Sequence, residues 1–142
     1  MRASLTSLVV ACALACGDAT GSSAASPVGG AWLYGGTQTT PSSAQLSGSL
    51  TWRGVASTPG GFEGTFVLTE VGLGGQPRTL AGTSAGQIVA DTIATFDLLL
   101  DSADRLHIGV FRGDSIVGTW AETGATGASG HFVMHRGTES AK

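Results

Sequence analysis

Apolar and polar residues alternate along this chain in short runs, and this pattern limits its fold more than any other feature of the sequence. Between residues 44 and 53 every second residue is apolar or small, ending at Trp52, and the residues between them are polar. Residues 62–71 repeat the pattern with Phe62, Phe66 and Leu68. Because successive side chains of a strand point to opposite faces, each run predicts a strand with one buried and one exposed face.

Turn residues separate the runs at nearly even spacing. Residues 58–61 and 72–77 are rich in Gly and Pro, which favours turns. Residues 78–84 and 86–90 are weaker strand candidates, and residues 129–136 predict a last strand. Between them, residues 92–123 predict three consecutive strands, joined by residues 101–104 and by the pair Gly113-Asp114.

These seven to nine strands predict an all-β fold, an antiparallel meander that closes into a small up-and-down barrel of about eight strands. Closure would remove the exposed edges of a flat sheet. A two-sheet sandwich is the alternative. With 142 residues, of which 42% are hydrophobic and only 12% charged, the chain suits a single domain and neither a disordered chain nor a helical bundle.

The pair Gly113-Asp114 predicts a two-residue hairpin with Gly at the position of positive φ. This turn would place Phe111 opposite Ile116, His107 opposite Trp120, and Arg105 opposite Glu122, an opposite-charge pair that supports the register. One face of these strands would then point inward, and we expect it to carry Phe96, Leu98, His107, Phe111, Ile116 and Trp120. The other face would carry an apolar patch of Ile108, Val110 and Val117.

Four of the inward residues, Phe96, His107, Phe111 and Trp120, are the candidate ligand-binding residues. A buried histidine among aromatic rings could hold the polar group of a small hydrophobic ligand. The alternative is a histidine at the edge of the core, bonded to backbone or water. An interior cavity would favour binding, and a filled interior would favour a structural or protein-interaction module with no ligand.

Other kinds of chemistry find little support in the sequence. The net charge is −3 and the seven Lys and Arg residues are scattered, so nucleic-acid binding is not expected. His131 and His135 would lie about 13 Å apart along one strand, too far to share a zinc ion. No metal or cofactor is expected. No serine lies in a Gly-x-Ser-x-Gly elbow or has a base partner, so we expect no enzyme activity.

The first residues predict a signal peptide. Arg2 gives a positive start, and residues 5–15 form an apolar run too short to span a bilayer. The run ends in Ala13-Leu14-Ala15-Cys16-Gly17, which resembles the lipobox of bacterial lipoproteins. The resemblance implies that Cys16 receives a lipid and becomes the mature N-terminus.

Two alternatives remain for this segment. Cys12 follows Val9-Val10-Ala11 and also fits the motif, and an ordinary secretory signal could be cleaved after Ala15 or near Ala24. With Cys16 as the site, the chain divides into a signal peptide (1–16), a flexible tether (17–29), the barrel (30–137) and a tail (138–142). The lipid would anchor an exported protein to a membrane of the bacterial envelope, facing the periplasm or the exterior. The sequence assigns no protein partner.

The two ends of the barrel are similar to those of lipocalins and their calycin relatives. Gly30-Ala31-Trp32 opens the first strand and Arg136 ends the last. The resemblance implies that Trp32 closes one end of the barrel with Arg136 packed across it, a cation-π contact. It also implies that the barrel encloses a small apolar or amphipathic ligand. Gly118-Thr119-Trp120 is similar to the strand tryptophan signals of avidin-type barrels.

Overall fold

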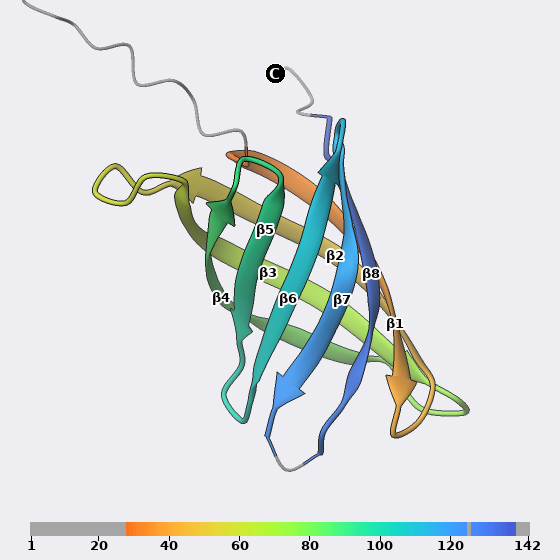
Figure 1. Ribbon diagram of the computed structural model, residues 1–142. Coiled ribbons are helices and arrows are strands. Elements are labelled where there is room, and N and C mark those ends of the chain that lie inside the picture. The colour runs from red at the N-terminus through yellow and green to blue at the C-terminus, as the bar shows by residue number, and fades with distance from the viewer. Residues whose placement is uncertain (1–27, 125, 139–142) are drawn as a thin grey trace, which may run out of the picture.

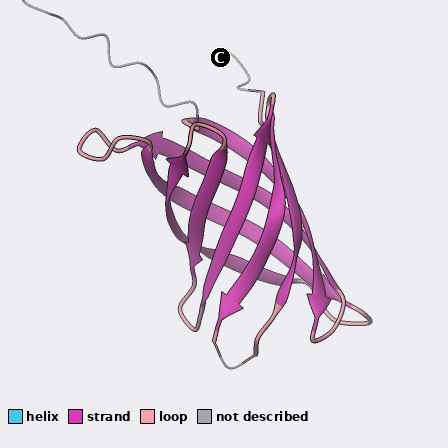
Figure 2. Ribbon diagram, in the orientation of Figure 1, coloured by secondary structure: helices cyan, strands magenta, loops and turns pink. Residues whose placement is uncertain are grey.

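A computed structural model describes residues 28–124 and 126–138 of the chain. This part consists of strands joined by turns (Figures 1 and 2). No helix in the two described ranges could cross a bilayer. The strands are β1 (Gly30–Thr40), β2 (Ala44–Gly54), β3 (Gly61–Gly72), β4 (Arg78–Val89), β5 (Ile93–Leu99), β6 (Asp104–Arg112), β7 (Ser115–Thr123) and β8 (Ser129–Arg136).

Each strand pairs antiparallel with its neighbours in the chain, and β8 pairs with β1, so the sheet is a closed barrel. The predicted up-and-down barrel is therefore confirmed, and the sandwich alternative is excluded. The hairpin at Gly113, whose φ is 63°, also has the expected register. His107 lies opposite Trp120, and Arg105 lies opposite Glu122.

One expectation about the strands was wrong, because residues 78–84 and 86–90 form the single strand β4 rather than two. A Cβ atom at Gly86 would lie 2.5 Å from Phe96 Cβ and 2.7 Å from the ring of Phe62. This glycine therefore makes room for two side chains inside the barrel. The turn follows later, at Ala90 and Asp91, which both have positive φ.

The interior of the barrel is filled largely by aromatic rings, in contact with one another. Trp52, for example, lies 4.6 Å from Phe62 and 4.9 Å from Phe96 between ring centroids, and its Nε1 donates to Ser84 Oγ at 2.6 Å. The buried aromatic side chains of the described residues are Trp32, Tyr34, Trp52, Phe62, Phe66, Phe96, Trp120 and Phe132.

Glycines on the inner face let neighbouring strands approach closely. A Cβ atom at Gly118 would lie 2.0 Å from the Ile108 carbonyl oxygen, and one at Gly130 would lie 1.8 Å from that of Thr37. Glycines at such positions allow the strong coiling that a small closed barrel requires.

The barrel end where β1 begins and β8 ends is closed by side chains (top of Figure 1). Arg136 Cζ lies 4.8 Å from the centroid of the Trp32 ring, within the reach of a cation-π contact. Trp32 Nε1 donates to the Val28 carbonyl at 2.8 Å, and Arg136 Nη1 donates to the Gly29 carbonyl at 2.8 Å. The structure thus brings Trp32 and Arg136 together in the arrangement that the lipocalin resemblance implies.

Candidate ligand-binding site

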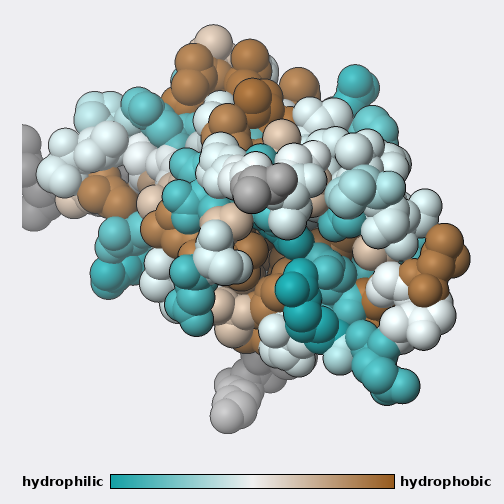
Figure 3. Space-filling model, turned by 90° about the horizontal axis from the view of Figure 1, so that it is seen from below, coloured by the Kyte–Doolittle hydropathy of each residue, from teal (hydrophilic) through white to brown (hydrophobic). Residues whose placement is uncertain are grey.

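A cavity of about 390 Å³ opens at the opposite end of the barrel. Its walls come from the last residues of β1, β3 and β7, from the first residues of β4 and β6, and from residues 100–102. Viewed directly, this end has hydrophilic side chains beside a central hollow (Figure 3). The cavity is therefore a polar mouth above an aromatic interior.

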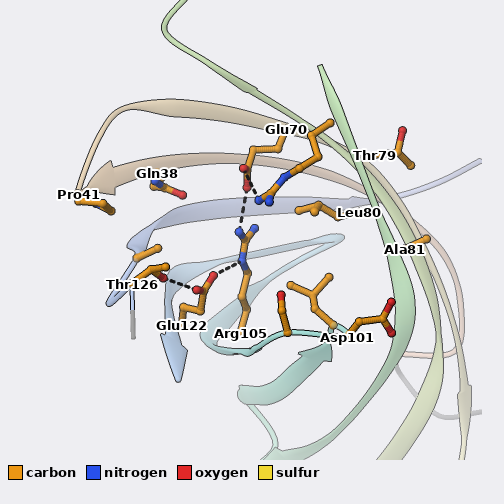
Figure 4. A pocket seen from close by; sticks show the side chains of 14 residues that line it. Gln38, Pro41, Glu70, Thr79, Leu80, Ala81, Asp101, Arg105, Glu122 and Thr126 are labelled. Atoms are coloured by element: carbon orange, nitrogen blue, oxygen red, sulfur yellow. Dashed lines mark hydrogen bonds and ion pairs between the residues drawn. The ribbon is translucent and has the colours of Figure 1, made fainter. Parts of the chain in front are cut away.

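Arg105, on β6, stands in the middle of this mouth with its side chain only 4% exposed. Its Nε donates to Glu122 Oε2 at 3.1 Å, and its Nη2 donates to Glu70 Oε2 at 2.9 Å (Figure 4). The guanidinium also lies 4.8 Å from the centroid of the Trp120 ring. Its third nitrogen, Nη1, is buried and has no partner among the described residues.

Both carboxylates around Arg105 have further donors. Glu70 Oε1 accepts from Arg78 Nη2 at 2.7 Å, and Glu122 Oε1 accepts from the Thr126 hydroxyl. The hydrogen bond from Thr126, together with Arg105, lowers the pKa of Glu122 although partial burial opposes the shift. Two arginines and two glutamates thus form one network in which the formal charges cancel.

The cavity extends sideways because the barrel wall is incomplete beside it. β4 pairs with β5 only from Thr83 to Val89, so residues 78–82 run on without a partner strand on that side. The chain after β5 turns away at residues 100–103 to begin β6. Leu80 and Leu100 line the cavity from this side, and Ala128 lines it from the turn before β8.

Beneath the mouth, His107 and Tyr34 form a buried polar pair. His107 Nδ1 lies 2.8 Å from the Arg105 carbonyl, which can only accept, so Nδ1 carries the proton. Nε2 then accepts from the Tyr34 hydroxyl at 3.1 Å. Burial lowers the pKa of His107 to about 3 and raises the pKa of Tyr34 well above its usual value. Both groups are neutral at pH 7 and serve as internal hydrogen-bond partners.

The structure brings three of the four predicted ligand-binding residues together. The His107 ring lies 4.6 Å from that of Phe96 and 6.2 Å from that of Trp120. Phe111 lies apart, in edge contact with Trp32 at 6.4 Å, because four residues along a strand span about 13 Å. None of the four lines this cavity or the two shallow outer hollows between β8 and β2 and between β2 and β5. Ligand binding by this set stays a prediction.

The sequence interpretation used Arg105 and Glu122 only to support the hairpin register, and it did not consider Glu70 or Arg78 as site residues. A signal was nevertheless present. In the expected register, Arg105 and Glu122 share the inward face with His107 and Trp120, and a charged pair on an inner face needs a polar environment. Glu70 and Arg78 flank the turn between β3 and β4 and lie opposite each other in register.

Comparison with known proteins identifies the fold but no family. No family model matches this sequence, and no curated protein matches it. A solved structure described as EF1p2_mFAP2b bound to DFHBI superposes with a TM-score of 0.59 and 10% sequence identity. The match covers 77% of this chain and 93% of that chain. At this identity the likeness shows a shared barrel fold.

Proposed function

We propose that this protein binds a small molecule in the mouth of its barrel. The observation that carries the proposal concerns Arg105, which lines a cavity of about 390 Å³ and whose Nη1 is a buried donor without a partner among the described residues. Small-molecule sites have volumes of roughly 300 to 1,000 Å³ and a few fixed polar groups. A buried donor left without an acceptor costs about 1–3 kcal/mol, which an acceptor on a ligand would recover.

The structural comparison supports this proposal at the level of the fold. The structure described as EF1p2_mFAP2b bound to DFHBI shares the barrel and contains a small molecule. Barrels of about eight strands have interiors that are filled by side chains or hold one small ligand. Here the aromatic rings fill the middle of the barrel, so we place the ligand at the mouth and not among Phe96, His107, Phe111 and Trp120.

We also propose that the protein is a lipid-anchored component of the bacterial envelope. The support is the pattern of residues 1–16, with an apolar run before Cys16, and the Ser- and Ala-rich segment that follows it. These residues lie outside the described part of the chain.

A matched pair of tryptophan substitutions tests the binding proposal. Leu100 lines the cavity, whereas its neighbour Leu99 is 40% exposed on the outer face. We expect native mass spectrometry of the protein from its own host to show a retained small molecule. Leu100→Trp should fill the cavity and abolish retention, and Leu99→Trp should preserve it. A wild-type protein that retains nothing, or retention unchanged by Leu100→Trp, contradicts the proposal.

An alternative function uses the outer face. Val110 and Val117 are exposed and lie opposite each other on β6 and β7, and Ile108 is exposed beside them. Exposed apolar patches mark contacts with proteins or membranes. The expected patch is therefore confirmed, and an interaction module is the second candidate function.

A further inference from the structure

The charges around the cavity restrict what it can bind. Arg78 and Arg105 are paired with Glu70 and Glu122, so the network contributes no net charge. Asp101, on the rim, adds a negative charge that is exposed to solvent. An anionic ligand would lose its hydration without meeting a surplus positive charge, and this loss is costly.

Binding of a cationic ligand is also unfavourable. Each oxygen of the Glu70 carboxylate already accepts a hydrogen bond from an arginine, and Glu122 accepts from Arg105 and Thr126. The charges of both glutamates are balanced by Arg78 and Arg105, so a cation would lose its hydration without meeting a surplus negative charge in this network. The remaining acidic side chain, Asp101 on the rim, is exposed, and solvent screens its attraction for a cation.

The buried polar atom that the wall leaves without a partner is a donor. Among described residues, Arg105 Nη1 and Trp120 Nε1 are the buried side-chain atoms without a protein partner, and of these two residues Arg105 lines the cavity. A guanidinium nitrogen donates and cannot accept. Leu80, Leu100 and Ala128 provide apolar contacts in the same wall.

From these observations we infer that the cavity selects an uncharged molecule with a carbonyl-type oxygen, which accepts from Arg105 Nη1, and a small apolar body against Leu80, Leu100 and Ala128. The inference rests on the proposed function, since it names the ligand class for the same cavity. It is narrower than the expectation of a small apolar or amphipathic ligand, because the acceptor oxygen is required.

Four compounds built on one benzene ring separate the contributions of charge and acceptor. Acetophenone is uncharged with a carbonyl, toluene is uncharged without an acceptor, benzoate is an anion, and benzylammonium is a cation. Each would be titrated into the full chain at pH 7, with the backbone amide resonances of Leu80 and Ala128 reporting occupancy of the cavity. We expect acetophenone to bind about tenfold more tightly than each of the others, the value of one hydrogen bond to a charged donor.

The outcomes distinguish the two proposals. Tightest binding by benzoate or benzylammonium overturns the inferred ligand class but leaves small-molecule binding in place, and so does equal binding of toluene and acetophenone. If none of the four compounds moves the cavity resonances, the proposed function itself fails.

A variant of the arginine tests the role of Nη1 directly. Arg105→Lys keeps a positive charge near Glu70 and Glu122 but has a single side-chain nitrogen and no donor at the position of Nη1. We expect it to lose the preference for acetophenone over toluene, while Arg53→Lys, altered at a side chain that is 79% exposed and paired with Glu63 outside this cavity, keeps it. Circular dichroism would confirm that both variants fold. A preference that survives in folded Arg105→Lys overturns the assignment, and if this variant does not fold, the four-compound comparison decides alone.

Discussion

The buried residue His107 makes the stability of this barrel depend on pH. His107 is fully buried and neutral, held between the Arg105 carbonyl and the Tyr34 hydroxyl. Its pKa is about 3 in the folded protein, against an ordinary value near 6.5. Between these values the unfolded chain binds a proton that the folded chain does not, so the free energy of unfolding falls as the pH falls.

We therefore expect His107→Phe to flatten the pH dependence of stability. In the wild type, this one residue should remove up to about 1.4 kcal/mol for each pH unit below 6.5. Urea denaturation between pH 6.5 and 5 would measure the slope, in a range above the titration of most carboxylates. The variant loses the acceptor for Tyr34 at every pH, which lowers stability without changing the slope.

His131→Phe, on the exposed outer face, is the control and should keep the wild-type slope. An unchanged slope in His107→Phe would show that another group dominates the acid response.

For single residues, the sequence predicted which residues pair across neighbouring strands better than it predicted what each residue does. The hairpin turn was enough to place His107 opposite Trp120, because strand pairing follows from local turn geometry. The part played by Arg105 depends on Glu70, which lies 35 residues away in the chain and meets it only when the barrel closes. Local patterns contain no information about such a contact.

Among the strands, close packing depends on glycines as much as on large side chains. Gly118 on β7 lies opposite Gly109 on β6, and the two strands approach each other there. The alternating pattern predicted most strands, since it requires only local information. It divided β4 at residue 85, where small residues such as Ala85 and Gly86 make the alternation weak, and the rings that Gly86 accommodates cannot be inferred from a local pattern.

Gly118→Ala should destabilise the barrel strongly. Its Cβ would lie 2.0 Å from a backbone carbonyl of the neighbouring strand, so both strands would have to shift, at a cost of about 3 kcal/mol. Gly72→Ala is the matched control, because nothing lies within 4 Å of its Cβ position, and it should change stability by about 0.5 kcal/mol or less. Urea denaturation of both variants measures the difference. Equal stabilities would mean that the close approach is not essential.

At the scale of the whole molecule, the prediction concerns attachment of the protein to a membrane by a lipid. We expect the full chain, expressed in a bacterium, to incorporate labelled palmitate and to partition into detergent. Cys16→Ser should abolish both properties, and Cys12→Ser should preserve them. A Cys16→Ser protein that remains labelled would move the site to Cys12, and a wild type without label would favour an ordinary secretory signal.

The placement of the strand ends affects how the protein would meet its surroundings. β1 begins and β8 ends at the same end of the barrel (Figure 1). Trp32 caps this end, whereas the cavity opens at the other end. In a barrel fastened to a support through residues before β1, the attachment point and the opening would therefore lie at opposite ends, and the support would not cover the opening. Solutes could enter by diffusion without crossing the support, so the protein would sample the aqueous phase and not the surface that carries it.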